Sequence, residues 1–254
     1  MIRETITAKY GSETVADLSL IDQYAQDIAS MHETHNVIVV TSGAAALGEM
    51  IWVERYGQED ELPSKQVLAT MGSARISNAW DEALWRHGIS SMQVLGTPHE
   101  IMDPFERPEL KSVLTEGLER GMVPNVNGND AMTRLLVAEI EHLYDNDGVG
   151  ALIMSLMGLG AYVMHSSRGG FFDEDGKEVS LLLPDQYDWA LDIARQRDEQ
   201  AKLEKKLGTG GLTKKMEAGI RVAQGGANAA IVKAGTPLKA SISGEAGTFI
   251  PAVA

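Results

Sequence analysis

The sequence contains no cysteine among its 254 residues. Disulfide bonds, zinc–thiolate sites and thiol nucleophiles are therefore excluded. Histidine offers little more for a metal, because the one close pair, His32 and His35, has no third ligand indicated near it. The sequence predicts no metal ion held directly by protein side chains.

The first residues show no feature of a targeting segment, and the sequence contains no long hydrophobic run. Its first residues, MIRETITAKYGS, contain neither the apolar stretch nor the small-residue cleavage site of a signal peptide, so a cytoplasmic location is the default expectation. The most apolar run, residues 149–164, is too short to cross a bilayer comfortably and is interrupted by Gly158 and Gly160. It predicts a buried helix that leads into a strand, and no membrane partner is expected.

Positive charge is scarce. Lys and Arg number 22 against 36 Asp and Glu, which gives a net charge of −14 and an isoelectric point near 4.8. Such a surface repels nucleic-acid phosphates and anionic membranes, so no nucleic-acid partner is expected. If the substrate is an anion, a local cluster of lysines must attract it against the overall charge of the protein.

Short segments rich in β-branched residues alternate with longer segments of helical periodicity. This alternation predicts an α/β fold with a mainly parallel sheet and helices on both faces. No internal repeat or Pro/Ser-rich linker divides the chain, so residues 1–254 are expected to form one domain. The expected strands are residues 4–11, 36–43, 90–97, 122–128, 161–166, 227–235 and 247–250. The expected helices are residues 17–32, 44–57, 64–87, 108–120, 148–157, 185–200 and 213–224, with a hairpin at residues 169–183 that turns at 175–176.

Polar and glycine residues follow these strands and do not precede them. Residues 9–12, 41–43, 127–130 and 166–170 each end or follow a predicted strand. Ligands of parallel α/β sheets bind beyond the carboxyl ends of the strands. The sequence therefore predicts a binding site at that edge of the sheet.

The first two of these segments suit an anion. Lys9 is followed by Gly11 and Ser12, so a strand presents an ammonium group and then a turn whose backbone N–H groups can approach a phosphate. For this segment alone, an edge-strand lysine that discourages aggregation is an equally good interpretation. Ser42 and Gly43 stand between a strand and a helix start, which suits an anion or carboxylate, although Ser42 could also be an ordinary N-cap.

Two further clusters carry amides and carboxylates. Asn127, Asn129 and Asp130 suit a substrate that bears both an ammonium group and carboxylates, although such clusters are more often simple turns. Asp145 and Asp147 stand just before the apolar helix. Asp147 could cap that helix, or it could orient lysines and magnesium around a transferring phosphoryl group.

In the segment GTGGLTKKMEAG, residues 208–219, the three glycines Gly208, Gly210 and Gly211 precede a lysine pair at a predicted helix start. It is not a Walker A loop, because Lys214 comes four residues after Gly210 and no Gly-Lys-Ser/Thr occurs. Its glycine N–H groups, its helix N-terminus and the side chains of Lys214 and Lys215 together suit a polyphosphate. A lysine in the first turn of a helix opposes the macrodipole at a cost of about 0.3–1 kcal/mol, which favours a functional interpretation.

Taken together, these segments resemble the glutamate 5-kinases, a group within the amino acid kinase family, in order and spacing over nearly the whole chain. The resemblance is to the kinase domain, without the C-terminal PUA domain that many members carry. The most specific segments are VTSGA, LPSKQ, DND and GTGGLTKK. The matching segments are AKYGSETV, VIVVTSGAAALG, LPSKQVLATMGSARI, QVLGT, GMVPNVNGND, DNDGVGAL, GTGGLTKKMEAG and the terminal GTFI.

The resemblance implies a three-layer αβα sandwich, the amino acid kinase fold, which binds ATP with Mg²⁺ and phosphorylates the γ-carboxylate of L-glutamate on the way to proline. It implies small-molecule substrates, a homo-oligomer (dimer or tetramer) and Mg²⁺ held mainly by the ATP phosphates.

By position, the resemblance gives Lys9 and Lys215 the role of stabilising the transferring phosphoryl group and gives Asp147 the role of organising both lysines. The implied amino-acid-binding residues are Ser42, Gly43, Asn127, Asp130 and Asn146. The implied nucleotide-binding residues are Lys9, Gly11, Ser12, Ser166, Ser167, Gly208, Thr209, Gly210, Gly211 and Lys215.

The sequence departs from the family pattern at three places. Residues 166–168 are Ser-Ser-Arg where the family usually has Thr-Asp, Gly128 stands where a glutamate is common, and Lys214 stands where a small residue or threonine is common. These departures leave two alternatives to glutamate phosphorylation. One is a divergent kinase for another carboxylate or a phosphate acceptor, and the other is a non-catalytic ligand-binding paralogue.

Overall fold

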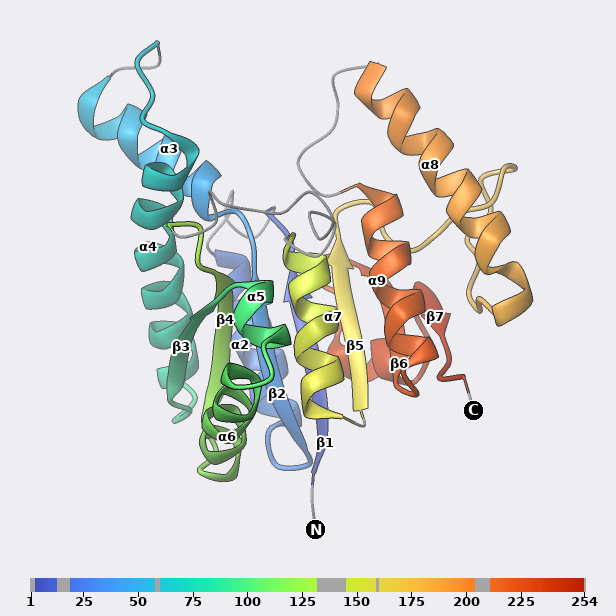
Figure 1. The fold of residues 1–254 in the computed structure, drawn as a ribbon, viewed down its shortest axis with the longest axis horizontal. Helices are drawn as coiled ribbons and strands as arrows, with labels where there is room; N and C mark the ends of the chain where they lie inside the picture. The colour runs from blue at the N-terminus through green and yellow to red at the C-terminus, as the bar shows by residue number, and fades with distance from the viewer. Residues whose placement is uncertain are drawn as a thin grey trace.

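A computed structural model describes residues 3–12, 19–57, 60–131, 145–158, 160–203 and 211–253 of the chain. Within these residues the centre is a seven-stranded sheet with the order β3-β4-β2-β1-β5-β6-β7 (Figure 1). Neighbouring strands are parallel except β6 and β7, which are antiparallel. The strands are β1 (Glu4–Tyr10), β2 (His35–Thr41), β3 (Ser91–Gly96), β4 (Val123–Gly128), β5 (Gly160–Ser166), β6 (Asn228–Lys233) and β7 (Thr248–Ile250).

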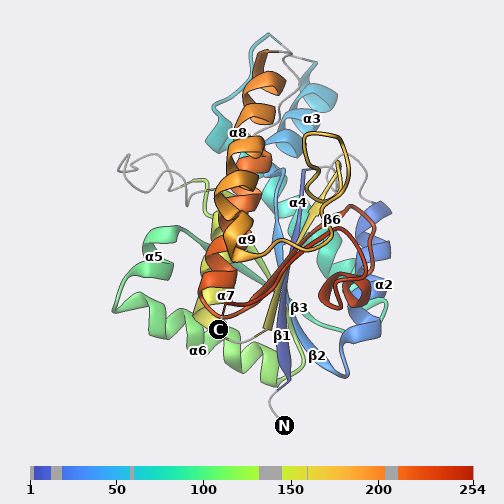
Figure 2. The same ribbon diagram turned by 90° about the vertical axis from the view of Figure 1, so that its right-hand side faces the viewer.

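Helices cover both faces of the sheet, as the edge-on view shows (Figure 2). The three-layer αβα sandwich with a mainly parallel sheet, expected from the sequence, is therefore confirmed. None of the described helices is long and apolar enough to cross a membrane. The helices on one side are α2 (Ser19–Met31), α3 (Ala44–Tyr56), α4 (Lys65–Trp85) and α10 (Leu238–Ile242). Those on the other side are α5 (Pro98–Met102), α6 (Glu106–Glu119), α7 (Asn146–Met157), α8 (Tyr187–Leu203) and α9 (Leu212–Gln224).

Most of the predicted elements occur within a few residues of their expected bounds. The five-residue helices α5 and α10 were not predicted, because one turn and a half carries no measurable periodicity. The expected hairpin at residues 169–183 is reduced to a single antiparallel bridge between Phe172 and Glu178, with Gly176 in the turn at a φ of 77°. Leu181 then leaves the hairpin and forms a parallel bridge with Phe249 of β7.

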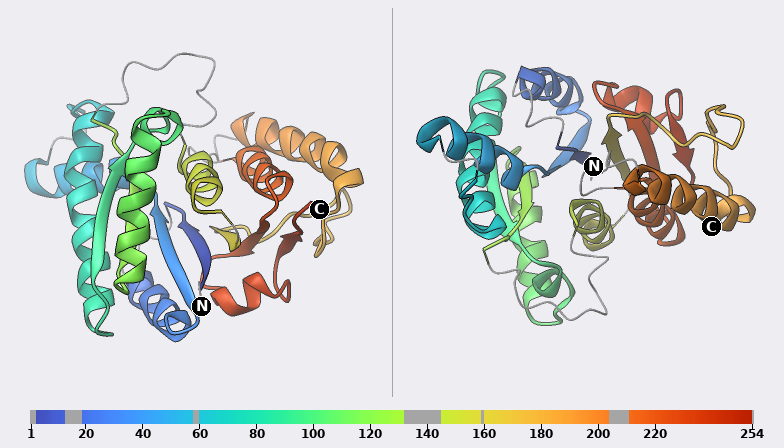
Figure 3. Two further views of the ribbon diagram at one scale, coloured as in Figure 1. Left: turned by 60° about the horizontal axis from the view of Figure 1, so that its bottom comes forward. Right: turned by 90° about the horizontal axis from the view of Figure 1, so that it is seen from above.

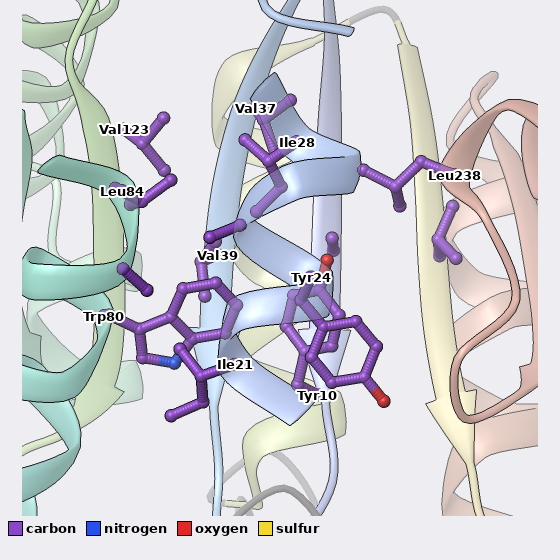
Figure 4. Close-up of a cluster of buried hydrophobic side chains, with 14 of the residues drawn as sticks. Tyr10, Ile21, Tyr24, Ile28, Val37, Val39, Trp80, Leu84, Val123 and Leu238 are labelled. Atoms are coloured by element: carbon purple, nitrogen blue, oxygen red, sulfur yellow. The ribbon is translucent and has the colours of Figure 1, made fainter. Parts of the chain in front are cut away.

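Strand β1 is buried on both faces of the sheet. Its successive side chains point alternately into the hydrophobic core beside α2 and toward the opposite face of the sheet. Tyr10 points into the core between the sheet and α2, where its ring centroid lies 4.2 Å from that of Tyr24 and 5.1 Å from that of Trp80 (Figure 4). Successive side chains of a strand point to opposite faces, so Lys9 faces the helices on the other side. Lys9 is therefore buried inside a central strand, and edge protection does not explain it.

The chain reverses its direction of travel across the sheet at β1. From β1 it passes to β2 through α2, and it reaches β5, the other neighbour of β1, only after β3 and β4 are complete. Helix α7, which precedes β5, contacts β1 from the face opposite α2. Seen from above, α7 lies between the α3–α4 pair and the α8–α9 pair (Figure 3, right). Ligands of open α/β sheets bind at such a switch point.

Candidate active site

Three ionic side chains meet at the carboxyl end of β1. Lys9 Nζ lies 2.8 Å from Oδ1 of Asp147, and Lys215 Nζ donates to Oδ2 of the same carboxylate at 2.8 Å. The three side chains are 5%, 9% and 2% exposed for Lys9, Lys215 and Asp147, respectively. One carboxylate shared by two ammonium groups leaves a net charge of +1, so the cluster can attract an anion despite the acidic surface.

The charges of this cluster shift the titration of its members. Burial on its own would raise the pKa of the Asp147 carboxyl, but the ammonium groups of Lys9 and Lys215 outweigh burial and hold that pKa at about 2. Burial lowers the pKa of the Lys9 ammonium group; Asp147 opposes this effect, and repulsion from Lys215 adds to it. Asp147 is therefore ionised at neutral pH and anchors both lysines.

Two contacts fix Asp147 in the first turn of α7. Asp145 is the N-cap residue, and its Oδ1 accepts a hydrogen bond from the Gly148 N–H at 2.7 Å. Tyr162 of β5 donates its hydroxyl to the backbone carbonyl of Asp147 at 2.9 Å. A Cβ at Gly150 would stand 2.3 Å from that hydroxyl, so glycine is needed for α7 to lie this close to β5. Because Asp145 provides the cap, the side chain of Asp147 faces the lysines.

Lys215 projects from the first turn of α9, and a carboxylate from α8 holds the start of that helix. Asp198 accepts hydrogen bonds from the Leu212 N–H and the Thr213 N–H, both at 2.9 Å. The sequence suggested that N–H groups at this helix start would receive a polyphosphate. In the structure the protein's own carboxylate already satisfies two of them, so a phosphate at this end has to use other donors.

Lys214, the unexpected lysine of the pair, has a partner of its own. Its Nζ lies 3.1 Å from Oδ2 of Asp145, with side chains 39% and 16% exposed. The pair joins α9 to the N-cap of α7, in parallel with the pair of Lys215 and Asp147. Lys214 thus compensates a carboxylate next to the buried cluster, a role that the sequence pattern did not reveal.

The residues expected to bind the acceptor meet at the end of β4. Asn127 is buried, and its Oδ1 accepts a hydrogen bond from the Gly128 N–H at 2.8 Å. A Cβ placed on Gly128 would lie 3.8 Å from Asn146 Oδ1 and 4.0 Å from Asp130 Oδ1. Burial raises the pKa of Asp130, and the nearby Lys65 opposes that shift. The structure therefore places the side-chain amides of Asn127 and Asn146 and the carboxylate of Asp130 near Gly128. A Cβ at this position would be at ordinary van der Waals distance from Asn146 and Asp130.

The start of α3 supplies the other expected acceptor residues. The N-cap position is Gly43, with a φ of 90° and no side-chain cap, so Ser42 does not act as an N-cap. Both residues are half-buried after β2. Two close glycine contacts set the path of α3 against α4: a Cβ at Gly48 would lie 1.8 Å from a backbone oxygen of α4, and one at Gly72 would lie 1.9 Å from a backbone oxygen of α3.

The residues expected to bind the nucleotide are placed in part. Gly11 is buried and Ser12 is exposed directly after β1, while Ser166 ends β5 and its hydroxyl accepts a hydrogen bond from the Arg168 N–H at 3.3 Å. Ser167 is exposed beside it. Gly211 is the N-cap residue of α9. The remaining three, Gly208, Thr209 and Gly210, lie outside the described residues.

Two contributors to the site could not be found from the sequence. Asp198 lies in a helix of ordinary charge pattern, and the ion pair of Lys214 with Asp145 joins residues 69 positions apart. Only the pairing of tertiary neighbours reveals either one. In the described part of the chain, no three His, Cys, Asp or Glu side chains lie close enough together to hold a metal ion.

The family profile described as the amino acid kinase family matches residues 4–233, which include β1 through β6 and all three members of the buried cluster. The chain belongs to the amino acid kinase family. Carbamate kinase from Giardia has the same fold, with a TM-score of 0.65 and 13% identity over the full length of both chains. N-acetylglutamate synthase from Neisseria gonorrhoeae, in complex with coenzyme A and L-arginine, also matches the whole of this chain in fold, with a TM-score of 0.67 and 12% identity over 62% of the synthase.

Several curated proteins similar to this chain are named glutamate 5-kinase. The protein from Chromohalobacter salexigens is 30% identical over 87% of this chain and 57% of its own length. That from Maridesulfovibrio salexigens is 28% identical over 86% of this chain and 58% of its own length. Glutamate 5-kinase 2 from Rhizobium meliloti is 28% identical over 97% of this chain and 93% of its own length. The chain thus spans more than nine-tenths of one relative and under two thirds of the other two.

Proposed function

We propose that the protein transfers the γ-phosphoryl group of ATP to the γ-carboxylate of L-glutamate and forms L-glutamyl 5-phosphate, a step toward proline. The observation that carries this proposal is the pair of buried lysines that share Asp147. Phosphoryl transfer needs little covalent help from a protein, because positive charge and positioning supply most of the catalysis. Two ammonium groups held by one carboxylate provide fixed positive charge at a single point.

In the proposed step, a γ-carboxylate oxygen attacks the γ-phosphorus and forms an acyl phosphate, while the bond from that phosphorus to the β,γ-bridging oxygen breaks and releases ADP. The acceptor carboxylate is already ionised at neutral pH, so no general base is required. Lys9 and Lys215 stabilise the charge on the phosphoryl oxygens during transfer. Asp147 keeps both ammonium groups in place, so that they need not reorganise when the charge develops.

We assign the acceptor to the side of the site formed by β2, β4 and the start of α7. Asp130 faces the ammonium group of the amino acid, and Asn127 and Asn146 bind its carboxylates. Ser42 and the Gly43 backbone complete the contacts at the start of α3. The proximity of Asp130 and Asn146 around Gly128 supports this assignment.

We assign the nucleotide to the side formed by the ends of β1 and β5 and the start of α9. Gly11, Ser12, Ser166 and Ser167 come from the two strand ends. Gly208, Thr209, Gly210 and Gly211 precede α9, and Lys9 and Lys215 point to the phosphates from either side. The family resemblance supports these positions.

Magnesium fits this arrangement as a companion of ATP. The only carboxylate in the buried cluster, Asp147, already pairs with two lysines, so it has little capacity left for a cation. We propose that Mg²⁺ is held mainly by the ATP phosphates and that it neutralises part of their charge.

The assay is incubation with ATP, Mg²⁺, L-glutamate and hydroxylamine, with hydroxamate and ADP measured together. Hydroxamate formed in proportion to ADP supports the proposal, because hydroxylamine traps an acyl phosphate. ADP that appears only with another carboxylate or with a phosphate acceptor would contradict glutamate as the substrate. No turnover across a broad acceptor panel would contradict a kinase and favour a ligand-binding paralogue.

One observation favours the second candidate, a kinase for a related acceptor. Gly128 presents no side chain where Asp130 and Asn146 converge, so the position leaves space for about one carbon atom that a side chain would otherwise fill, which favours a somewhat larger acceptor. A substrate panel that includes longer and γ-substituted carboxylic acids separates the two candidates.

We further propose that residues 1–254 form one domain and that the protein assembles as a homo-oligomer. Light scattering after gel filtration can test the assembly, and a single cooperative unfolding transition can test the single domain.

A further inference from the structure

Asp198 makes an unusually specific contact for a residue outside the buried cluster. It lies on α8 with 8% exposure, and both of its carboxylate oxygens are used: Oδ1 accepts from the Leu212 N–H and Oδ2 from the Thr213 N–H. A carboxylate at a helix N-terminus satisfies orphan N–H groups and interacts favourably with the macrodipole. The same helix turn carries Lys215, two residues after Thr213.

The residue before this turn is adapted to the contact. A Cβ on Gly211 would lie 2.2 Å from Asp198 Oδ2, closer than any side-chain contact allows. The last glycine of GTGG therefore leaves the space that the Asp198 carboxylate occupies, and any larger residue would displace that carboxylate. Gly211 and Asp198 form a matched pair that sets where α9 begins.

Helix α8 is itself held in place by other contacts, so the hydrogen bonds of Asp198 can fix the start of α9 relative to the rest of the protein. Trp189 of α8 donates its Nε1–H to Glu174 Oε1 at 2.9 Å, and its ring packs edge-on against Phe171 at 5.5 Å between centroids. Asp198 thus connects the first turn of α9 to a helix held against the segment after β5.

We propose that Asp198 is a positioning residue for Lys215. It fixes the first turn of α9, and therefore the distance of the Lys215 ammonium group from Asp147 and from the transferring phosphoryl group. This inference rests on the proposed function, and it adds that the N–H groups of Leu212 and Thr213 serve to hold the catalytic lysine and do not bind the nucleotide.

A merely structural cap and a positioning residue have different consequences. Loss of a cap lowers the stability of the protein and leaves the folded enzyme unchanged. Loss of a positioning contact also lowers kcat in the folded enzyme, because a displacement of about 1 Å in a catalytic group can cost roughly 100-fold in rate. The lowering must disappear when the positioned residue is already absent.

The experiment compares Asp198→Asn with Asp192→Asn, a matched loss of charge on the exposed face of α8, where Asp192 forms an ion pair with Arg195 of the same helix. We expect Asp198→Asn to lower kcat by roughly 10- to 100-fold with KM for glutamate within about twofold, and Asp192→Asn to leave both unchanged. In a Lys215→Ala background, Asp198→Asn should lower kcat no further. Gly211→Ala should act like Asp198→Asn, because it displaces the same carboxylate.

A second measurement needs no turnover. The Lys215 Nζ signal in a ¹⁵N spectrum, assigned by its loss in Lys215→Ala, should shift in Asp198→Asn and stay in place in Asp192→Asn. If the wild type forms no hydroxamate, the glutamate kinase proposal fails while this measurement still decides the role of Asp198. An unmoved Lys215 signal, or kcat effects of Asp198→Asn and Lys215→Ala that multiply, would overturn the positioning role.

Discussion

At the scale of single residues, the two lysines at the start of α9 have different surroundings although they are adjacent in sequence. Lys215 is buried against Asp147, whereas Lys214 is partly exposed against Asp145. A buried ammonium group acts in a low-dielectric environment, so it stabilises a developing negative charge more strongly than an ammonium group in water does. The pair therefore provides a matched test of catalysis within one helical turn.

We expect Lys215→Ala to lower kcat by roughly 100- to 1,000-fold with little change in glutamate affinity. Lys214→Ala removes the same charge one position earlier, and we expect a loss of about tenfold or less, because surface ion pairs contribute little. Steady-state kinetics for the phosphorylation of glutamate measure both variants. Equal losses for the two variants would contradict the specific role of Lys215.

Asp147 also predicts a dependence of stability on pH. Its pKa in the folded protein, about 2, lies below the ordinary 3.8, so its stabilisation is fully present above about pH 4 and is lost as the pH falls through 2. Asp147→Asn should lower the free energy of unfolding at pH 7 by about 3–5 kcal/mol, because two buried lysines lose their partner. Urea unfolding between pH 2 and pH 7 should show this difference shrinking below pH 4. A difference in unfolding free energy that stays constant down to pH 2 would show that the pKa of Asp147 is not lowered in the folded protein.

At the scale of elements, helices α3 and α4 pack backbone against backbone. The backbones of the two helices touch through Gly48 and Gly72, so neither position has space for a Cβ. Because α3 begins at the Gly43 N-cap, beside Ser42, the separation of the two helices also positions part of the proposed acceptor site.

We expect Gly72→Ala to push α3 away from α4, to lower the free energy of unfolding by about 1–3 kcal/mol and to raise KM for glutamate. Thr70→Ala on the exposed side of the same helix is the control, because its hydroxyl donates to a carbonyl within α4. Thermal unfolding and initial-rate kinetics measure the two effects. A destabilised variant with unchanged KM would show that α3 does not position the acceptor.

Elements and strand ends were largely predictable, and contacts between elements were not. Lys9 and Asp147 belong to segments whose local pattern marks them as strand end and helix start, so the sequence could suggest them. The packing glycines Gly72 and Gly150 give no local signal, because a Cβ at either position meets atoms from a different element. Asp198 likewise gives no local signal, because its role depends on how α8 packs against α9.

At the scale of the whole molecule, a small positive centre lies within a strongly acidic protein. The net charge of −14 repels anions such as the proposed substrates ATP and glutamate at a distance, while the net positive charge of the buried cluster favours an anion at contact. The Debye length falls from about 30 Å at 0.01 M salt to about 8 Å at 0.15 M, and buried pairs are screened much less than exposed charges.

We therefore expect KM for the nucleotide to fall as ionic strength rises from about 0.01 to 0.15 M, with Mg²⁺ held saturating, because salt screens the long-range repulsion first. Initial rates measured in sodium chloride and in potassium acetate separate this effect from specific anion binding. A KM that rises steadily with salt would show that the lysine cluster dominates the field at a distance.

The central place of β1 in the sheet has a consequence for biosynthesis. One edge of β1 pairs with β2, which follows soon after it, but the other edge pairs with β5, which begins only at Gly160. A ribosome needs roughly 6–24 s to add the roughly 120 residues between β2 and β5 at about 5–20 residues per second. During that interval an apolar strand presents an unpaired edge, so the nascent chain depends on dilution or chaperones until β5 closes the sheet.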